Sequence, residues 1–223
     1  IHTKWDNSSA ILAGDGVYTI AQIILNKLSG LHSNEVSKYF NDVTLEICEG
    51  QALDKEYENN YLTNEQNYLE MVEKKTGALL GASASLPLIQ NGNDALSIKH
   101  SNEFGRHLGK GFQIQDDVLE ITSDEKVMGK SLESDIFEGK QTIMFIKANN
   151  RYHKRWSDLI SQSSKTTIKE NVSSFLYETG IINEAEHIAK SYFDLSRKSI
   201  EKLQCMNKDE LLEFIKLIEK RTY

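Results

Sequence analysis

Three carboxylates stand close together in the sequence GFQIQDDVLE, residues 111–120. Asp116 and Asp117 are adjacent, and Glu120 follows four residues after Asp116. On a helix, Asp116 and Glu120 share a face, and Asp117 lies about 100° round the helix axis. The other residues of the stretch are mostly apolar, and burying adjacent carboxylates without a cation is costly. The triplet therefore predicts a cation on this helix face, and an acidic patch exposed to solvent is the simpler alternative.

Oxygen ligands select a hard cation, and a site with few protein carboxylates suits Mg²⁺ completed by water and substrate phosphates. Lysines that could bind such phosphates occur in two other segments. Lys75 stands beside Thr76, and Lys130 and Lys140 each follow a glycine, which lets a side chain swing over a bound anion. Taken singly, lysines are usually surface residues. Their combination with the triplet indicates a site for a phosphorylated ligand that binds together with metal.

The composition limits the class of protein. Hydrophobic residues make up 39% and charged residues 26% of the 223 residues, which argues against disorder. A single proline, Pro87, disfavours an all-β fold, and the net charge of −7 argues against general nucleic-acid binding. Cys48 and Cys205 lack metal-ligand or redox spacing, so we expect buried thiols of a cytoplasmic protein. We find no apolar run of membrane-spanning length and no signal peptide.

Helical periodicity runs through most of the sequence and indicates an all-α protein. We expect a first helix that is capped by Asn7 or Ser8 and ends near Leu28. Its expected inner face consists of Ala10, Ile11, Ala13, Val17, Ile20, Ala21 and Ile24. A helix over 94–121 carries the acidic triplet, and a long charged loop, 122–140, follows it.

The remaining expected helices account for the rest of the chain. The first begins at Ser33 or Asn34. The second begins at a Thr63–Gln66 capping box and breaks near Pro87. The last four cover 140–152, 154–177, 181–204 and 207–221. The second of them contains the run GALLGASAS, whose small residues permit close approach by a neighbouring helix or a ligand. No linker, repeat or low-complexity tract interrupts these helices. We therefore expect residues 1–223 to form a single all-helical domain.

Five motifs, in order over residues 1–148, resemble those of the trans-isoprenyl (polyprenyl) diphosphate synthases. Phe112 and Gln113, followed by the acidic triplet, resemble the family's second aspartate-rich motif, with Glu120 at its last aspartate position. HTKWDNSSAILAGD is similar to the family's histidine-to-Gly-Asp helix start, with Asp6 where glycine is common. EGQALD resembles the Gly-Gln-x-x-Asp segment, and Lys75-Thr76 the Lys-Thr pair. GKSLESDIFEGKQT resembles the Gly-Lys loop.

The resemblance implies an isoprenoid-synthase-type helical bundle around a central cavity. It also implies a Mg²⁺-dependent reaction in which diphosphate leaves an allylic substrate, the alkene of isopentenyl diphosphate attacks the cation, and a proton is lost. Asp116 and Asp117 would hold Mg²⁺ against the allylic diphosphate, with Glu120 in support. A homodimer is the expected assembly, and the apolar faces of the first two helices are compatible with it.

The resemblance also implies roles outside the triplet. Lys75, Lys130 and Lys140 would stabilise the diphosphate as negative charge develops during C–O cleavage. Thr76 and Gln113 would face the developing carbocation and steer the attacking alkene. These five residues are thus the expected catalytic residues, and the lysines also bind substrate.

Gln51 and Asp54 would complete the cavity wall and its polar network, and a hydrogen bond between helices is the alternative explanation for them. The family's first aspartate-rich motif, and the basic pair that grips isopentenyl diphosphate, are expected before Ile1. Metal held from one wall supports ionisation poorly. We therefore expect these 223 residues alone to be inactive or nearly so, and a longer parent to be a synthase. A terpene cyclase of the same all-α class and a non-catalytic partner subunit remain as alternatives.

Overall fold

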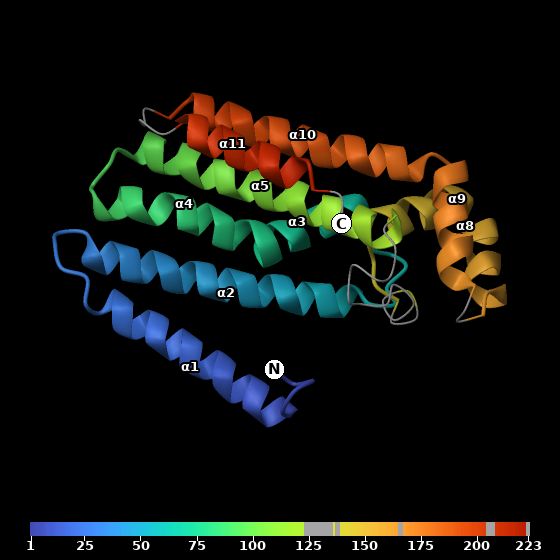
Figure 1. Ribbon diagram of the computed structural model, residues 1–223, viewed down its shortest axis with the longest axis horizontal. Coiled ribbons are helices and arrows are strands. Elements are labelled where there is room, and N and C mark those ends of the chain that lie inside the picture. The colour runs from blue at the N-terminus through green and yellow to red at the C-terminus, as the bar shows by residue number, and fades with distance from the viewer. Residues whose placement is uncertain (123–135, 137–138, 165–166, 204–207, 222–223) are drawn as a thin grey trace.

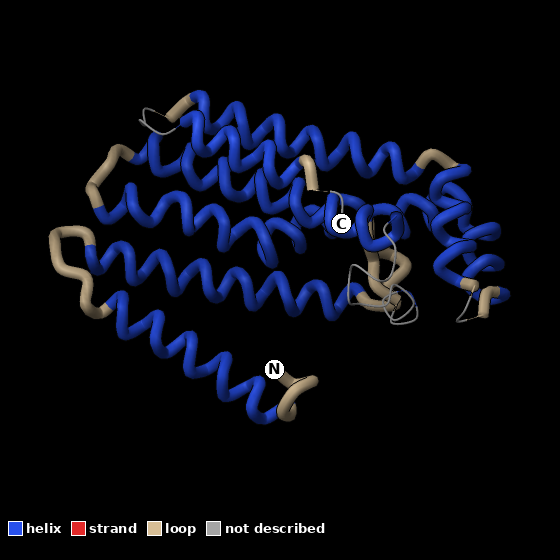
Figure 2. Tube along the Cα trace, viewed as in Figure 1, coloured by secondary structure: helices blue, strands red, loops and turns tan. Residues whose placement is uncertain are grey.

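The computed structural model describes residues 1–122, 136, 139–164, 167–203 and 208–221. Throughout these residues the regular secondary structure is helical, without a strand (Figure 2). The N-terminal half contains α1 (Asn7–Leu25), α2 (Ser33–Tyr57), α3 (Glu65–Val72), a π-helical turn η1 (Glu73–Gly77), α4 (Ala78–Gln90) and α5 (Ala95–Thr122). The C-terminal half contains α8 (Ile143–Gln162), α9 (Ile168–Glu178), α10 (Ile181–Glu201) and α11 (Lys208–Glu219). The all-α fold class is thereby confirmed.

The long helices lie side by side as a stack, with α1 at one edge and α10 and α11 at the other (Figure 1). Helix α5 lies inside the stack, in contact with α4, η1 and α10. The helices α8 and α9 close one end. The main hydrophobic core forms where α3, α5, α8, α9 and α10 meet, and it contains Tyr68, Leu108, Ile114, Ile146 and Phe193.

Glycines bring α5 close to η1 and α4. A Cβ on Gly109 would come within 2.5 Å of the Gly77 Cα, and a Cβ on Gly105 would collide with the Leu80 carbonyl. Helix α5 therefore meets η1 and α4 backbone to backbone, as the small residues of GALLGASAS suggested. This contact sets the distance between the end of η1 and the middle of α5, about two turns before the acidic triplet begins.

Several expected helix boundaries were wrong, for local reasons. Asp6 caps α1, because its carboxylate accepts from the Ser9 amide at 2.7 Å. Asn64 and Asn67 form the capping box of α3, in place of Thr63 and Gln66. Pro87 lies inside α4, where packing against α2 and α5 outweighs the lost hydrogen bond.

The expected boundary between helices near residue 153 is a kink inside α8. Tyr152 leaves helical geometry (φ −131°, ψ 35°), but the helix continues to Gln162. The helix expected over 154–177 is instead interrupted after Gln162, and α9 starts at Ile168. Thr167 donates to the Ser164 carbonyl and accepts from the Ser164 amide at 3.1 Å, so these hydroxyls satisfy the local backbone groups. The proposed Asn207 cap of the last helix lies outside the described residues.

The expected inner face of α1 is exposed. No residue of α1 is buried, and Ile11 and Val17 are 64% and 68% exposed. The helix packs on α2 through polar contacts such as Gln22 Nε2 to Asn41 Oδ1 at 2.7 Å. Periodicity identified an apolar face correctly, but the described residues supply no partner that covers it.

Among the described residues, α1 is also the one helix whose length and composition would let it cross a membrane, with a mean hydropathy of 1.3. A single helix of this kind near the N-terminus is weak evidence for a span, because a signal sequence or a core helix has the same properties. Cys48, expected to be buried, is an exposed free thiol on α2. Cys205 lies outside the described residues.

Candidate active site

The π-helical turn η1 presents Lys75 and Thr76 to different partners. Lys75 Nζ lies 2.5 Å from Asp54 Oδ2 on α2, and Thr76 donates to Gln113 Oε1 on α5 at 3.1 Å. The neighbouring Lys74 points away, toward Glu49 at 3.1 Å. A π-turn inserts an extra residue into a helix and is often found at functional sites. Here it lets consecutive side chains reach two different helices.

Charges on two helices hold η1 in place. Arg106 of α5 binds Glu46 of α2 through both terminal nitrogens, at 2.6 and 2.7 Å, and lies 3.4 Å from Glu73. Glu73 also pairs with Lys110. Burial alone would raise the pKa of Glu73, but the Lys110 hydrogen bond and the two cations outweigh burial and lower this pKa. On the other side of η1, a Cβ on Gly50 would collide with the Lys75 backbone nitrogen.

Asp117 points into the core. It is 3% exposed, and its two oxygens accept hydrogen bonds from Tyr68 at 2.7 Å and from Gln113 at 3.1 Å. Burial raises the pKa of Asp117, although the charge of Lys140 and the two hydrogen bonds oppose this. Burial and the nearby carboxylate also raise the pKa of Tyr68 well above its usual value, so its hydroxyl stays protonated and donates.

Asp116 lies on the outer side of α5. Its side chain is 36% exposed and forms an ion pair with Arg221, whose guanidinium lies 4.2 Å above the Phe112 ring. Burial raises the pKa of Asp116, and Arg221 and Lys140 oppose that effect. Glu120 is on the same side, with its carboxylate 3.8 Å from Lys140 Nζ. Each carboxylate of this outer pair thus faces a cation.

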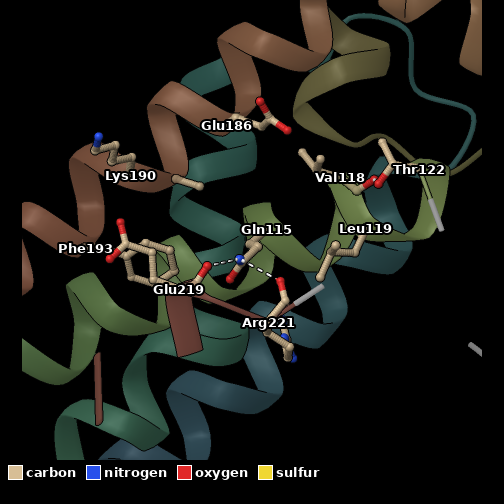
Figure 3. A pocket seen from close by; sticks show the side chains of 10 residues that line it. Gln115, Val118, Leu119, Thr122, Glu186, Lys190, Phe193, Glu219 and Arg221 are labelled. Carbon is tan, nitrogen blue, oxygen red and sulfur yellow. Dashed lines mark hydrogen bonds between the residues drawn. The ribbon is translucent and has the colours of Figure 1, made fainter. Parts of the chain in front are cut away.

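Gln115, the neighbour of Asp116, anchors the C-terminal segment, residues 219–221 (Figure 3). Its amide nitrogen donates to the backbone carbonyls of Glu219 at 2.8 Å and Arg221 at 3.5 Å. A pocket of about 340 Å³ lies between this segment, α5 and α10. In the described part of the chain, Gln115 Oε1 and Arg221 Nε are buried without a hydrogen-bond partner. Unsatisfied buried polar atoms destabilise this docked position of the segment.

The opposite side of α5, which carries Asp117 and is called the inner side here, encloses only a small cavity, of about 10 Å³. Its polar lining consists of Asp54, Tyr68, Lys75, Gln113, Asp117, Lys140, Gln141 and Thr142. This volume holds at most about one water molecule. Because the polar groups bond to one another, substrate entry requires these side chains to exchange partners.

The residues fit a Mg²⁺ ion that is held from one side. Among the described residues, no three His, Cys, Asp or Glu side chains converge into a metal cluster. Mg²⁺ needs only one or two protein carboxylates when water and phosphate oxygens complete its shell. Asp116 and Glu120 already pair with Arg221 and Lys140, so this face attracts positive charge. Asp117 has both oxygens occupied by protein donors.

The structure brings together most residues that the sequence singled out. Lys75 and Asp54 pair directly, whereas Gln51 donates to Asp54 within α2 at 3.4 Å, so Gln51 does not itself bridge helices. Lys130 lies outside the described residues. Tyr68 and Arg221 were missed. Tyr68 belongs to an apolar stripe, and Arg221 follows the last helix, where no motif marks it.

Comparison with known proteins agrees with this arrangement. A sequence profile described as polyprenyl synthetase matches residues 1–177. The geranylgeranyl diphosphate synthase of Methanosarcina mazei is 34% identical over 228 residues, which cover 100% of this chain and 69% of that protein. The geranylgeranyl pyrophosphate synthase of Geoglobus acetivorans is 37% identical over 204 residues, which cover 90% of this chain and 63% of that protein.

Solved structures give the same result. The Geoglobus acetivorans geranylgeranyl pyrophosphate synthetase matches with a TM-score of 0.83 and 33% identity, over 99% of this chain and 69% of that one. The Pyrococcus horikoshii geranylgeranyl pyrophosphate synthetase matches with a TM-score of 0.86 and 30% identity, over 99% and 69% of the two chains. The chain belongs to the polyprenyl synthetase family. It spans roughly two thirds of the length of these relatives.

Proposed function

We propose that the chain is part of a chain-elongating prenyltransferase that condenses an allylic diphosphate with isopentenyl diphosphate. The observation that carries this proposal is the opposition of carboxylates and lysines across α5. Asp116 and Glu120 line its outer side, Lys140 lies 3.8 Å from Glu120, and both Lys140 and Lys75 line the small cavity beside Asp117. Relatives named geranylgeranyl diphosphate synthase support the same reaction class.

Each residue has a chemical task in this reaction. Bound Mg²⁺ would neutralise the diphosphate and favour its departure. Asp116 and Glu120 would hold the metal, and Asp117 as a third ligand remains a prediction. Lys75 and Lys140 would exchange their carboxylate partners for diphosphate oxygens, and the prediction for Lys130 is the same.

Two polar side chains would then act on the organic part of the substrate. The oxygens of Thr76 and Gln113 would stabilise the allylic cation, because an oxygen lone pair favours nearby positive charge. Gln51 would support Asp54, and Asp54 would hold Lys75 until diphosphate arrives. Such preorganised charges act most strongly in a site that excludes water, and the small cavity has room for at most about one water molecule.

We propose a second copy of the chain as the partner of α1. The exposed apolar residues of this helix include Ile11, Leu12, Val17, Ile20 and Ile24. An apolar face of this length is typical of an interface rather than of a monomer surface. We further propose that residues 1–223 form one domain, because a single main core joins α3 through α11. We also propose that the enzyme is cytoplasmic.

A product assay tests the proposal. The protein that the gene encodes, with any residues that precede Ile1, is incubated with Mg²⁺, radiolabelled isopentenyl diphosphate and allylic diphosphates of several lengths. We expect elongated diphosphates that disappear on chelation of the metal. A cyclised or hydrolysed allylic product without incorporation of label would instead indicate a terpene cyclase. No turnover, together with increased activity of a complete synthase on mixing, would indicate a partner subunit.

A further inference from the structure

A chain of three hydrogen bonds links η1, α5 and α3, and it ends on a buried carboxylate. Thr76 Oγ1 donates to Gln113 Oε1 at 3.1 Å. Gln113 Nε2 donates to Asp117 Oδ1, also at 3.1 Å. From the other end, the Tyr68 hydroxyl donates to Asp117 Oδ2 at 2.7 Å. Every donated hydrogen therefore points toward Asp117, which acts as the terminal acceptor.

This direction decides which end of the Gln113 amide faces the site. An amide has a carbonyl that only accepts and a nitrogen that only donates. Because Asp117 takes the NH₂ end, the carbonyl is left for Thr76, and the Thr76 hydrogen is committed to that carbonyl. The oxygen lone pairs of both residues thus remain available to a positive charge. A flipped amide would present NH₂ instead and would repel a cation.

Tyr68 fixes the acceptor on which this order depends. It is 1% exposed and belongs to the main core, so its hydroxyl position is set by packing. Lys140 is the nearby cation that acts most strongly on Asp117. Without the Tyr68 hydrogen bond, the carboxylate would be free to rotate toward Lys140 and away from Gln113.

We propose that Tyr68 is a positioning residue, whose hydroxyl holds Asp117 so that Gln113 and Thr76 present oxygen to the positive charge formed in prenyl transfer. The inference rests on the proposed function, because that charge exists only if the allylic diphosphate ionises. It also gives Asp117 a task distinct from metal binding. A purely structural Tyr68 would stabilise the fold without affecting the preference of the site for a cation.

Two probes separate these roles in the protein that the gene encodes. One is inorganic pyrophosphate with Mg²⁺. The other is an allylic diphosphate analogue in which an ammonium nitrogen replaces the carbon that becomes positive. Tyr68→Phe removes one hydroxyl and keeps the ring. We therefore expect it to weaken binding of the ammonium analogue about tenfold and binding of pyrophosphate less than about twofold. The same variant should lower kcat about tenfold with little change in KM.

Tyr39→Phe is a matched control. The Tyr39 hydroxyl accepts hydrogen bonds from Asn102 at 2.5 Å and Ser85 at 3.3 Å, between α2, α4 and α5. It lies outside the Tyr68–Asp117 chain, so we expect no change in the ratio of the two dissociation constants. If Tyr68→Phe fails to fold, Asp117→Asn decides the question, because it permits the amide flip and should change the same ratio.

An equal loss for both probes, or no loss, would overturn the positioning role. That result would leave the proposed function intact, provided that the unsubstituted protein turns over. Absence of both turnover and Mg²⁺-dependent pyrophosphate binding in the unsubstituted protein would contradict the proposed function itself. The two failures are therefore distinguishable.

Discussion

Asp116 and Asp117 are adjacent in sequence but belong to two different parts of the site. The inner side, around Asp117, is buried and joined by hydrogen bonds to Tyr68 and Gln113. The outer side, around Asp116, is partly exposed, and its carboxylates form ion pairs with Arg221 and Lys140. Hydrogen-bonded buried groups rigidify a site, whereas exposed ion pairs exchange partners at little cost. The difference suggests that one side orients groups and the other side exchanges cations.

Removing the outer charge should have the largest effect. Asp116→Asn keeps the shape and removes a negative charge that would hold Mg²⁺, so we expect kcat to fall roughly 10²–10³-fold, as for the loss of other preorganised charges. Steady-state kinetics of the protein that the gene encodes measures this. Asp158→Asn, which changes an exposed carboxylate on α8, serves as the control and should be near neutral. Less than a twofold loss in Asp116→Asn would contradict an outer metal side.

Separating η1 from α5 should damage the inner side. In Gly109→Ala the new Cβ would lie 2.5 Å from the Gly77 Cα, so the helices must move apart. We expect a loss of about 1–3 kcal/mol in the free energy of unfolding, measured with urea. Gly14→Ala has no atom within 4 Å of its Cβ and should instead stabilise α1 by about 0.5–1 kcal/mol. Similar effects in both variants would show that the close contact is unimportant.

The two kinds of environment should also differ in their pH dependence. Lys110 and Arg106 lower the pKa of Glu73 below 4.5, so its contribution to stability is present above that value and lost as pH falls through the folded pKa. Burial raises the pKa of Asp117 above 3.8, so stability is instead lost as pH rises from that value through the raised pKa.

Urea unfolding across pH 3–7 measures both effects. Glu73→Gln should reduce the loss of unfolding free energy at acidic pH. Asp117→Asn should reduce the loss of unfolding free energy that occurs as pH rises above 3.8. These changes are smaller than those of Gly109→Ala, because Glu73 is only partly buried. If both variants shifted the curve in the same direction, the contrast between the two carboxylates would be wrong.

Releasing the C-terminal segment should have the smallest effect. Arg221 occupies the carboxylate that would bind metal, and its Nε is buried without a partner in the described chain. Arg221→Ala should therefore raise the apparent Mg²⁺ affinity by roughly two- to fivefold, the worth of a partly exposed ion pair. Calorimetric titration measures this, with Arg151→Ala, which breaks an exposed pair with Glu184, as control. Weaker Mg²⁺ binding by Arg221→Ala would show that Arg221 supports the site.

Sequence patterns predicted the parts of this arrangement that depend on local spacing. Charges embedded in apolar surroundings marked the triplet on α5, and small residues marked the close contact of α4 and α5. The pattern could not distinguish Asp116 from Asp117, because their difference arises from Tyr68 and Arg221, which lie far away in sequence. The expected burial of α1 was wrong because periodicity shows an apolar face but not what covers it.

Mg²⁺-dependent binding of inorganic pyrophosphate to Asp116→Asn and Asp117→Asn, compared by calorimetry under one set of conditions, tests the two-sided account most directly. The account predicts that Asp116→Asn abolishes the metal-dependent binding and that Asp117→Asn retains it within about threefold, because both Asp117 oxygens already accept hydrogen bonds from Tyr68 and Gln113. Equal loss in both variants would show that the adjacent aspartates act together as ligands. Full retention in Asp116→Asn would contradict a metal site on the outer side of α5.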